Sequence, residues 1–356
     1  MTTTPKVIKV LLIANDSSVS NLPWCVPPTM SYSDATVEVT HNPDLYVDGS
    51  DLDSFLDQYD LVIAHEKELP RWLEMFLDHH GKLVKVTRED KSVLQMQLYL
   101  AATNSPIEVH FPFWVTPWDY KAAHILPDCN KLIAKPVDGA RGECQILAPT
   151  DLMDAILTMS SDIPVNQLNE RFPEATFYFG EEHYAQGVLR DDAYFDVSNL
   201  MILPYIEDVV SEWRVVVSGS CLHMYRRQIE HTDNGTRIVV AGRHTYTVDG
   251  LKVENEEEAL ALNVIEHTGD TCTSVWRELR EVIKGAGITL GSVDVYVRAD
   301  GTVGIFEWCP QFGTLYSDRE QRRQLGIDFV TYWLDEKKIY IPEATYRDPK
   351  WTRLSH

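Results

Sequence analysis

The stretch VDVYVRADGTVGIFEWCPQFG, residues 293–313, has the pattern of a buried hairpin. Valines alternate with other residues from Val293 to Val297, and a second apolar run begins at Val303. The pair Asp300-Gly301 stands between the two runs, and Asp-Gly between alternating apolar segments is a strong signal for a two-residue loop. The sequence therefore predicts two antiparallel strands that turn at Asp300 and Gly301.

This hairpin carries an acidic residue on each strand. With the predicted loop, Asp294 lies directly opposite Glu307 on one face, and like charges in that arrangement cost about 0.2–1 kcal/mol. Either the two carboxylates tolerate each other on a solvated face, or they hold a cation between them. Mg²⁺ fits the second interpretation, because it takes one or two carboxylates together with water and substrate phosphates. The pattern alone leaves both interpretations open.

Composition limits the classes of protein to which the chain can belong. Its 356 residues suffice for two or three domains, with 44% hydrophobic and 24% charged residues, as in ordinary globular proteins. A net charge of −22 argues against general binding to nucleic acids or anionic membranes. Scattered cysteines without a Cys-x-x-Cys pair, and the lack of a long apolar run or secretory leader, lead us to expect a cytoplasmic protein.

The first hundred or so residues predict a small parallel α/β sheet. Apolar segments at 6–15, 59–65 and 81–87 have the composition of strands, and residues 68–81 between the last two have helical spacing. Strands that alternate with helices favour a parallel sheet, whose ligands bind at the carboxyl ends of the strands. No Gly-x-Gly-x-x-Gly follows the first strand, so a dinucleotide site is not expected here.

The rest of the chain mixes strands and helices in an α+β pattern. Residues 89–116 predict a helix with an extended exit, 131–147 a strand, a glycine-containing loop and a second strand, and 200–208 another strand. Residues 212–228 predict a hairpin and 273–287 an amphipathic helix. The aromatic-rich, acidic residues 161–198 are interpreted as an insertion.

Two clusters of basic residues accompany the acidic pair. Gly139 and Gly142, after Lys135, could bring backbone N–H groups and a positive charge to a polyphosphate, although an ordinary hairpin loop gives the same pattern. Arg214, within an apolar run, either pairs with an acid such as Glu212 or faces a ligand. Arg226 and Arg227 follow on the second strand of that hairpin.

In this order the segments resemble the ATP-grasp superfamily, which includes ribosomal-protein glutamate ligase, glutathione synthetase and D-alanine–D-alanine ligase. The resemblance covers roughly residues 85–320. It is carried by EDKSVLQMQLYLAATNSPIEVHFPFWVT (89–116), LIAKPVDGARG (132–142), ILPYIED (202–208), SEWRVVVSGSCLHMYRR (211–227) and VDVYVRADGTVGIFEWCP (293–310).

The resemblance implies a role for each matching residue. Lys91, Lys135, Gly139 and Gly142 would bind the phosphates of ATP, Tyr205 and Ile206 the adenine, Glu212 or Glu207 the ribose, and Asp294 and Glu307 Mg²⁺. Arg227 would face the phosphates, and Arg214 either the phosphates or an acid substrate. Two residues depart from the family pattern. Cys309 stands where asparagine usually provides a second metal contact, with Gln311 as a substitute, and Ser292 stands where many members have an arginine, whose role Arg214 or Arg243 would take.

The resemblance also implies an architecture and a reaction. A small N-terminal parallel α/β domain at 1–115 would precede two α+β lobes, at 116–205 and 206–345, that clamp the nucleotide, followed by a tail at 346–356. The enzyme would be an ADP-forming carboxylate–amine ligase for small-molecule or peptide substrates, possible as a homo-oligomer. A kinase that phosphorylates its substrate directly and a catalytically silent nucleotide-binding module stay as alternatives.

Overall fold

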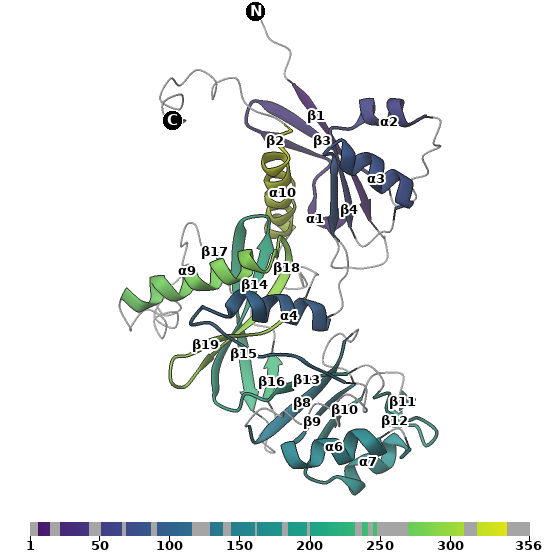
Figure 1. The fold of residues 1–356 in the computed structure, drawn as a ribbon, viewed down its shortest axis with the longest axis vertical. Helices are drawn as coiled ribbons and strands as arrows, with labels where there is room; N and C mark the ends of the chain where they lie inside the picture. The colour runs from purple at the N-terminus through teal and green to yellow at the C-terminus, as the bar shows by residue number, and fades with distance from the viewer. Residues whose placement is uncertain are drawn as a thin grey trace, which may run out of the picture.

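Three large β-sheets of the described residues follow one another along the long axis of the molecule (Figure 1). The computed structural model describes residues 6–14, 22–42, 51–65, 69–86, 91–115, 129–137, 144–160, 162–179, 184–197, 200–231, 237–240, 245–247, 270–309 and 319–339. Among these residues, no helix is both long and apolar enough to cross a membrane.

The first sheet has the strand order β2-β3-β1-β4-β5, in which β3, β1, β4 and β5 run parallel. Its strands are β1 (Val7–Ala14), β2 (Thr29–Tyr32), β3 (Ala35–His41), β4 (Leu61–His65) and β5 (Leu83–Val86). Its helices are α1 (Leu22–Cys25), α2 (Leu52–Gln58) and α3 (Arg71–His79). The predicted small parallel sheet is confirmed. Strands β2 and β3 were not predicted, although Ala35 and Val37 are buried in alternation with exposed residues.

The second sheet has the antiparallel order β10-β9-β8-β13-β7. Its strands are β7 (Phe113–Val115), β8 (Lys131–Pro136), β9 (Gln145–Pro149), β10 (Thr176–Tyr178) and β13 (Leu200–Pro204), with α6 (Thr150–Met159), α7 (Val165–Arg171) and the small hairpin of β11 (Tyr184–Ala185) and β12 (Val188–Leu189) beside them. Phe172, Phe177 and Phe195 belong to the core of this sheet. Residues interpreted from sequence as an insertion thus help to form the core.

The third sheet has the order β16-β15-β14-β18-β19-β6, with β17 paired to β15. Its strands are β6 (Glu108–Val109), β14 (Val209–Ser218), β15 (Cys221–His231), β16 (Arg237–Val240), β17 (Thr245–Thr247), β18 (Leu290–Arg298) and β19 (Val303–Cys309). Helices α4 (Lys91–Ala102) and α9 (Asp270–Gly285) cover one face, where Leu98 and Leu279 pack against Val293, Val295 and Val297. The opposite face of these strands carries Asp294.

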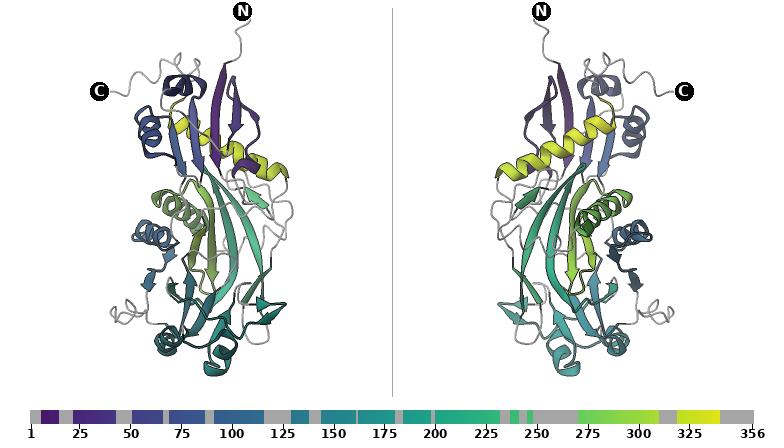
Figure 2. Two further views of the ribbon diagram at one scale, coloured as in Figure 1. Left: turned by 90° about the vertical axis from the view of Figure 1, so that its right-hand side faces the viewer. Right: turned by 90° about the vertical axis from the view of Figure 1, so that its left-hand side faces the viewer.

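Helix α10 (Arg319–Glu336), which was not predicted, joins the first sheet to the third. Leu325 and Phe329 share one buried cluster with Val10 of the first sheet and Val216 of the third. A side chain at Gly326 would overlap the backbone of Cys25, so glycine lets α10 approach α1 closely. Figure 2 shows α10 lying across one face of the first sheet, above the long strands of the third.

Candidate functional site

The hairpin of β18 and β19 places Asp294 and Glu307 directly opposite each other, as the sequence predicted. The predicted two-residue loop is wrong. Arg298 and Thr302 close a three-residue loop, in which Gly301 has φ +88°. A register shift between Asp294 and Val295 leaves Phe306 as the extra residue of β19, and this bulge restores the predicted pairing of the two acids.

A basic residue on the next strand neutralises Asp294. Arg214 of β14 is its direct cross-strand partner. The Arg214 Nε and Nη2 atoms donate to the two Asp294 carboxylate oxygens at 2.9 and 3.0 Å. Of the two interpretations of Arg214, pairing with an acid is the one observed, and the partner is Asp294 rather than Glu212.

Two lysines from different parts of the molecule approach Glu307. Lys91, the first residue of α4, has its Nζ atom 3.9 Å from Glu307 Oε2, and Lys135 of β8 has its Nζ atom 3.5 Å from the same oxygen. Because β8 belongs to the second sheet and β19 to the third, Glu307 lies where these two sheets meet. Three basic and two acidic side chains are thus gathered from five elements.

The charges around Glu307 favour its ionised form. Burial alone would raise the pKa of Glu307, as does Asp294, but Lys135, Lys91 and Arg214 hold that pKa below its ordinary value. The basic side chains thus offset the effect of Asp294 on the pKa of Glu307. Burial alone would lower the pKa of Arg214, but Asp294 raises it above its ordinary value.

The segment between the second and third sheets carries the residues predicted to contact adenine. The Tyr205 backbone N–H donates to the Lys131 carbonyl at 2.9 Å, which ties the segment to β8. Ile206 is buried in a small cluster with Val209 and Tyr296, and Phe306 packs against it. This cluster lies next to Asp294, because Tyr296 follows it by two residues on the same face of β18.

The two candidate ribose ligands differ in their surroundings. Glu207 forms an ion pair with Lys131, with 2.8 Å between Nζ and Oε1, and both side chains are more than 40% exposed. Glu212 is only 2% exposed and lies between Tyr296 and Arg227 in the register of the sheet. The side chains of Arg226 and Arg227 lie outside the described part of the chain.

Of the other predicted site residues, two lie within the described ranges and the rest lie outside them. Ser292 and Cys309 face each other in the row beside Asp294 and Glu307. The predicted residues beyond the described ranges are Gly139, Gly142, Arg243 and Gln311.

The acidic pair fits a metal ion whose remaining coordination positions are filled by a bound phosphate compound and water. Among the described residues, no three His, Cys, Asp or Glu side chains come together as a metal site. Asp294 and Glu307 provide two carboxylates, which suits Mg²⁺ where phosphates and water complete its coordination. Cys309 adds little to that set, because a neutral thiol is a poor ligand for Mg²⁺.

Sequence reasoning missed a second polar cluster beside the first. Tyr296, Glu108, His110 and Arg298 are joined by hydrogen bonds and ion pairs. Their sequence signal was weak, because each stands alone among apolar residues and they meet only when β6 adds to the edge of the third sheet.

No protein-family model and no curated protein matches this chain. Several solved structures are similar to it. The D-Ala:D-Ser ligase VanG of Enterococcus faecalis is 11% identical, with 93% of this chain and 100% of that chain covered and a TM-score of 0.45. The ATP-grasp ligase PsnB, complexed with a minimal precursor, is 10% identical, with 91% and 99% covered and a TM-score of 0.43. The D-cycloserine synthetase DcsG is 15% identical, with 91% and 99% covered and a TM-score of 0.42.

The chain is similar in structure to ATP-grasp ligases. With identities of 10–15% and TM-scores of 0.42–0.45, these likenesses carry no argument about function or substrates. We therefore base the proposed function on the residues of the site.

Proposed function

We propose that this protein is an ATP-dependent ligase that activates a substrate carboxylate as an acyl phosphate, forms ADP and joins the acyl group to an amine. One observation carries the proposal. Asp294 and Glu307 face each other within reach of Arg214, Lys91 and Lys135, each from a different element. Alternating positive and negative groups at the meeting of two sheets suit a polyphosphate with its metal.

Each charged group has a proposed task. Lys91 and Lys135 would leave Glu307 to bind phosphate oxygens, together with the backbone around Gly139 and Gly142. Asp294 and Glu307 would hold Mg²⁺, which when bound would neutralise charge on the transferred phosphate. The Tyr205–Ile206 segment would bind adenine, and Glu212 or Glu207 the ribose. Arg214 and Arg227 would stabilise the negative charge that moves during phosphate transfer.

The reaction requires little covalent chemistry from the protein. A substrate carboxylate oxygen attacks the γ-phosphorus and ADP leaves, which gives an acyl phosphate. An amine nitrogen then attacks the acyl carbon, phosphate leaves and the nitrogen loses a proton. Lys91, Lys135 and Arg214 would hold the reacting groups in line and neutralise charge, and closure of the two sheets over the site would exclude water from the acyl phosphate.

ADP release tests the proposal. The full chain is incubated with ATP, Mg²⁺ and a panel of amino acids and peptides, with hydroxylamine as a trap for acyl phosphates. We expect ADP formation that depends on a carboxylate substrate, a hydroxamate in the presence of hydroxylamine, and neither in the Glu307→Gln variant. Phosphate that stays on the acceptor and resists hydroxylamine would indicate a kinase. Nucleotide binding without ADP would indicate the silent module, which Cys309 and Ser292 in place of the usual family residues permit.

A further inference from the structure

The polypeptide chain connects the second sheet to the rest of the molecule through two segments. Its strands, β7 to β13, belong to the continuous segment 113–204. The chain enters it through residues 110–112, after β6, and leaves it through residues 205–208, before β14. Any rotation of the second sheet relative to the third must therefore be accommodated in these two short connections.

One arginine contacts both attachment points. The Arg298 Nε atom donates to both carboxylate oxygens of Asp208, at 2.9 and 3.1 Å. Its Nη1 atom donates to Glu108 at 3.3 and 3.4 Å. The Ala299 backbone N–H also donates to the Asp208 carbonyl at 2.9 Å. The end of one connection and the start of the other are thus fixed to the same turn of β18 and β19.

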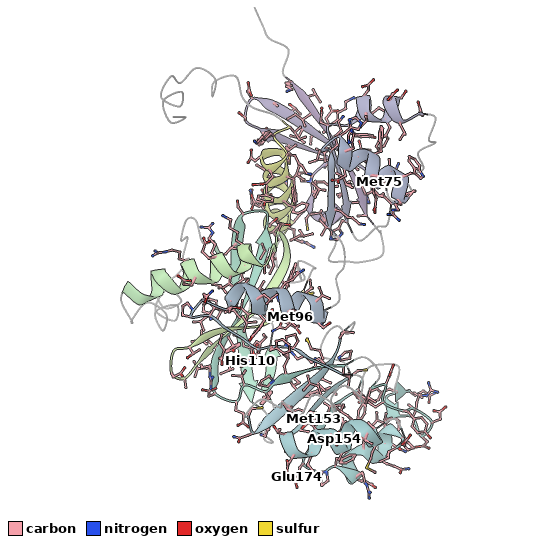
Figure 3. All side chains as sticks on the ribbon, viewed as in Figure 1. Met75, Met96, His110, Met153, Asp154 and Glu174 are labelled. Carbon is pink, nitrogen blue, oxygen red and sulfur yellow. The ribbon has the colours of Figure 1, made fainter. Side chains whose placement is uncertain are left out.

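Tyr296 adds a buried contact to the same carboxylate. Its hydroxyl donates to Glu108 Oε2 at 2.9 Å and lies 3.4 Å from the His110 Nε2 atom. His110, which is labelled in Figure 3, directly follows β6. The Tyr296 residue is fully buried, and burial together with Glu108 raises the pKa of its phenol, so the hydroxyl stays protonated. Its ring lies over Gly304, where any side chain would overlap it. The centroids of the Tyr296 and Phe306 rings are 4.4 Å apart, and Tyr296 belongs to the same buried cluster as Ile206.

We propose that Glu108, Asp208, Tyr296 and Arg298 form a clamp that holds the two connections together and positions the Tyr205–Ile206 segment relative to Asp294. The three residues Asp294, Tyr296 and Arg298 alternate on one strand, so the strand that carries the acidic pair also carries the clamp. Tyr296 and Arg298 are positioning residues, since they act through the connections rather than on reacting atoms. The clamp's effect on nucleotide binding rests on the proposed function, whereas its effect on the connections does not.

Hydrogen exchange of the full chain without ligand tests the clamp. In Tyr296→Phe, which keeps the ring, and in Arg298→Gln, we expect backbone exchange at His110, Phe111 and residues 205–208 to accelerate about fivefold or more. Exchange in β1 and β4 should not change. Because both variants act through Glu108, their combination should accelerate exchange by less than the product of the single effects.

Arg190→Gln is the matched control. Arg190 also makes a two-point pair with an aspartate, at 3.0 and 2.9 Å from Asp192, but on the exposed surface of the second sheet's helices and hairpins. Unchanged exchange in both connections of Tyr296→Phe, or an equal acceleration in Arg190→Gln, would overturn the clamp. If Arg298→Gln does not fold, Tyr296→Phe decides alone.

Nucleotide kinetics give the second readout. We expect the clamp variants to raise the KM for ATP about five- to tenfold and to change kcat less than twofold, because they displace a binding segment and leave Asp294 in place. A wild-type protein that binds no nucleotide would refute the proposed function, while the exchange experiment would still test the clamp.

Discussion

Asp294 and Glu307 are chemically similar, but their partners differ. Asp294 makes two short hydrogen bonds to one guanidinium, and its side chain is 9% exposed. Glu307 is 22% exposed and has two lysines at 3.5 and 3.9 Å, which are ion pairs without close hydrogen bonds. Exposed or loose ion pairs contribute little to stability, whereas a buried two-point pair leaves an uncompensated charge when one partner is removed.

We therefore predict that substitutions of the two acids differ in their effect on stability but not in their effect on activity. Asp294→Asn should lower the free energy of unfolding by roughly 1.5–3 kcal/mol, because Arg214 loses a charged acceptor. Glu307→Gln should lower it by about 1 kcal/mol or less. Both variants should lose ADP formation. Urea unfolding and the ADP assay measure the two effects.

The double variant Arg214→Met/Asp294→Asn serves as the control for that pair, because it removes the uncompensated charge. It should be more stable than Asp294→Asn alone. Equal losses of stability in Asp294→Asn and Glu307→Gln would contradict the assignment of different partners.

His65 gives a separate prediction at the end of the first sheet. It is the last residue of β4, is 2% exposed, and burial lowers its pKa from 6.5 to about 4. Between these values the unfolded chain binds a proton that the folded protein does not. Stability should therefore fall as the pH decreases from about 6.5 to about 4, by up to roughly 3 kcal/mol, and the contribution should be constant above that range.

Urea unfolding at several pH values in His65→Gln checks this, because glutamine does not titrate. We expect a shallower decrease of stability over that pH range than in the wild type. His79→Gln, at an exposed site on α3, should keep the wild-type slope. An unchanged slope in His65→Gln would mean that another group causes the acid sensitivity.

At the scale of elements, the hairpin shows how far sequence reasoning reached. Alternation of valines predicted the buried face, and Asp-Gly predicted a turn, but neither reveals a third loop residue or a bulge. The two errors cancelled, because the bulge at Phe306 offsets the register that the loop changes. The facing acids could therefore be predicted, although the loop and the bulge between them in the sequence could not.

Elements that depend on distant packing were harder to predict. The sequence of helix α10 shows no clear apolar stripe, because the helix packs against two sheets at once: its Leu325 shares a cluster with Val10 and Val216. The pairing of Glu108 with Tyr296 spans 188 residues of sequence, so no local pattern contains it. In contrast, β1, β4 and β8 have local apolar patterns and were predicted.

Gly304 tests how closely β18 and β19 approach through the Tyr296 ring. A Cβ at this position would overlap the ring, which β19 and Glu108 hold in place. Gly304→Ala should lower the free energy of unfolding by about 1–3 kcal/mol through overpacking, measured by urea unfolding. It should also accelerate backbone exchange at His110 and Phe111.

The control for this substitution is Gly285→Ala in α9. A Cβ there would lie 3.5 Å from the Ala101 side chain, an ordinary contact. Alanine favours a helix over glycine, so this variant should be as stable as the wild type or more so. A stable Gly304→Ala protein with unchanged exchange would show that Tyr296 can move without consequence.

In the molecule as a whole, the acidic pair lies where the second and third sheets meet, and different elements hold the three sheets together. Helix α10 unites the first sheet with the third, and the two connections unite the third with the second. Lys135 crosses from the second sheet to Glu307 of the third. The ion pair between them thus joins the two sheets at the position where the proposed ligand would bind.

This arrangement predicts that nucleotide and metal binding depend on each other. Without nucleotide, Lys135 and Lys91 compete with a cation for Glu307, so Mg²⁺ alone should bind weakly. Lys135→Met keeps the apolar stem of the side chain and removes its charge. In this variant, Mg²⁺ without nucleotide should bind about 3- to 10-fold more tightly than in the wild type, because one positive charge near the carboxylates is lost.

The same variant should bind ATP more weakly by roughly 1.5–3 kcal/mol, since it lacks a charge-assisted hydrogen bond to phosphate. Calorimetric titration with Mg²⁺ and with ATP measures both effects, which have opposite signs. Lys85→Met is the control, because Lys85 pairs with Glu74 at 2.8 Å on the first sheet, away from the site. It should change neither affinity. If Lys135→Met weakened the binding of both ligands or of neither, Lys135 would be a structural partner of Glu307. The proposal that Lys135 leaves Glu307 to bind phosphate would then be wrong.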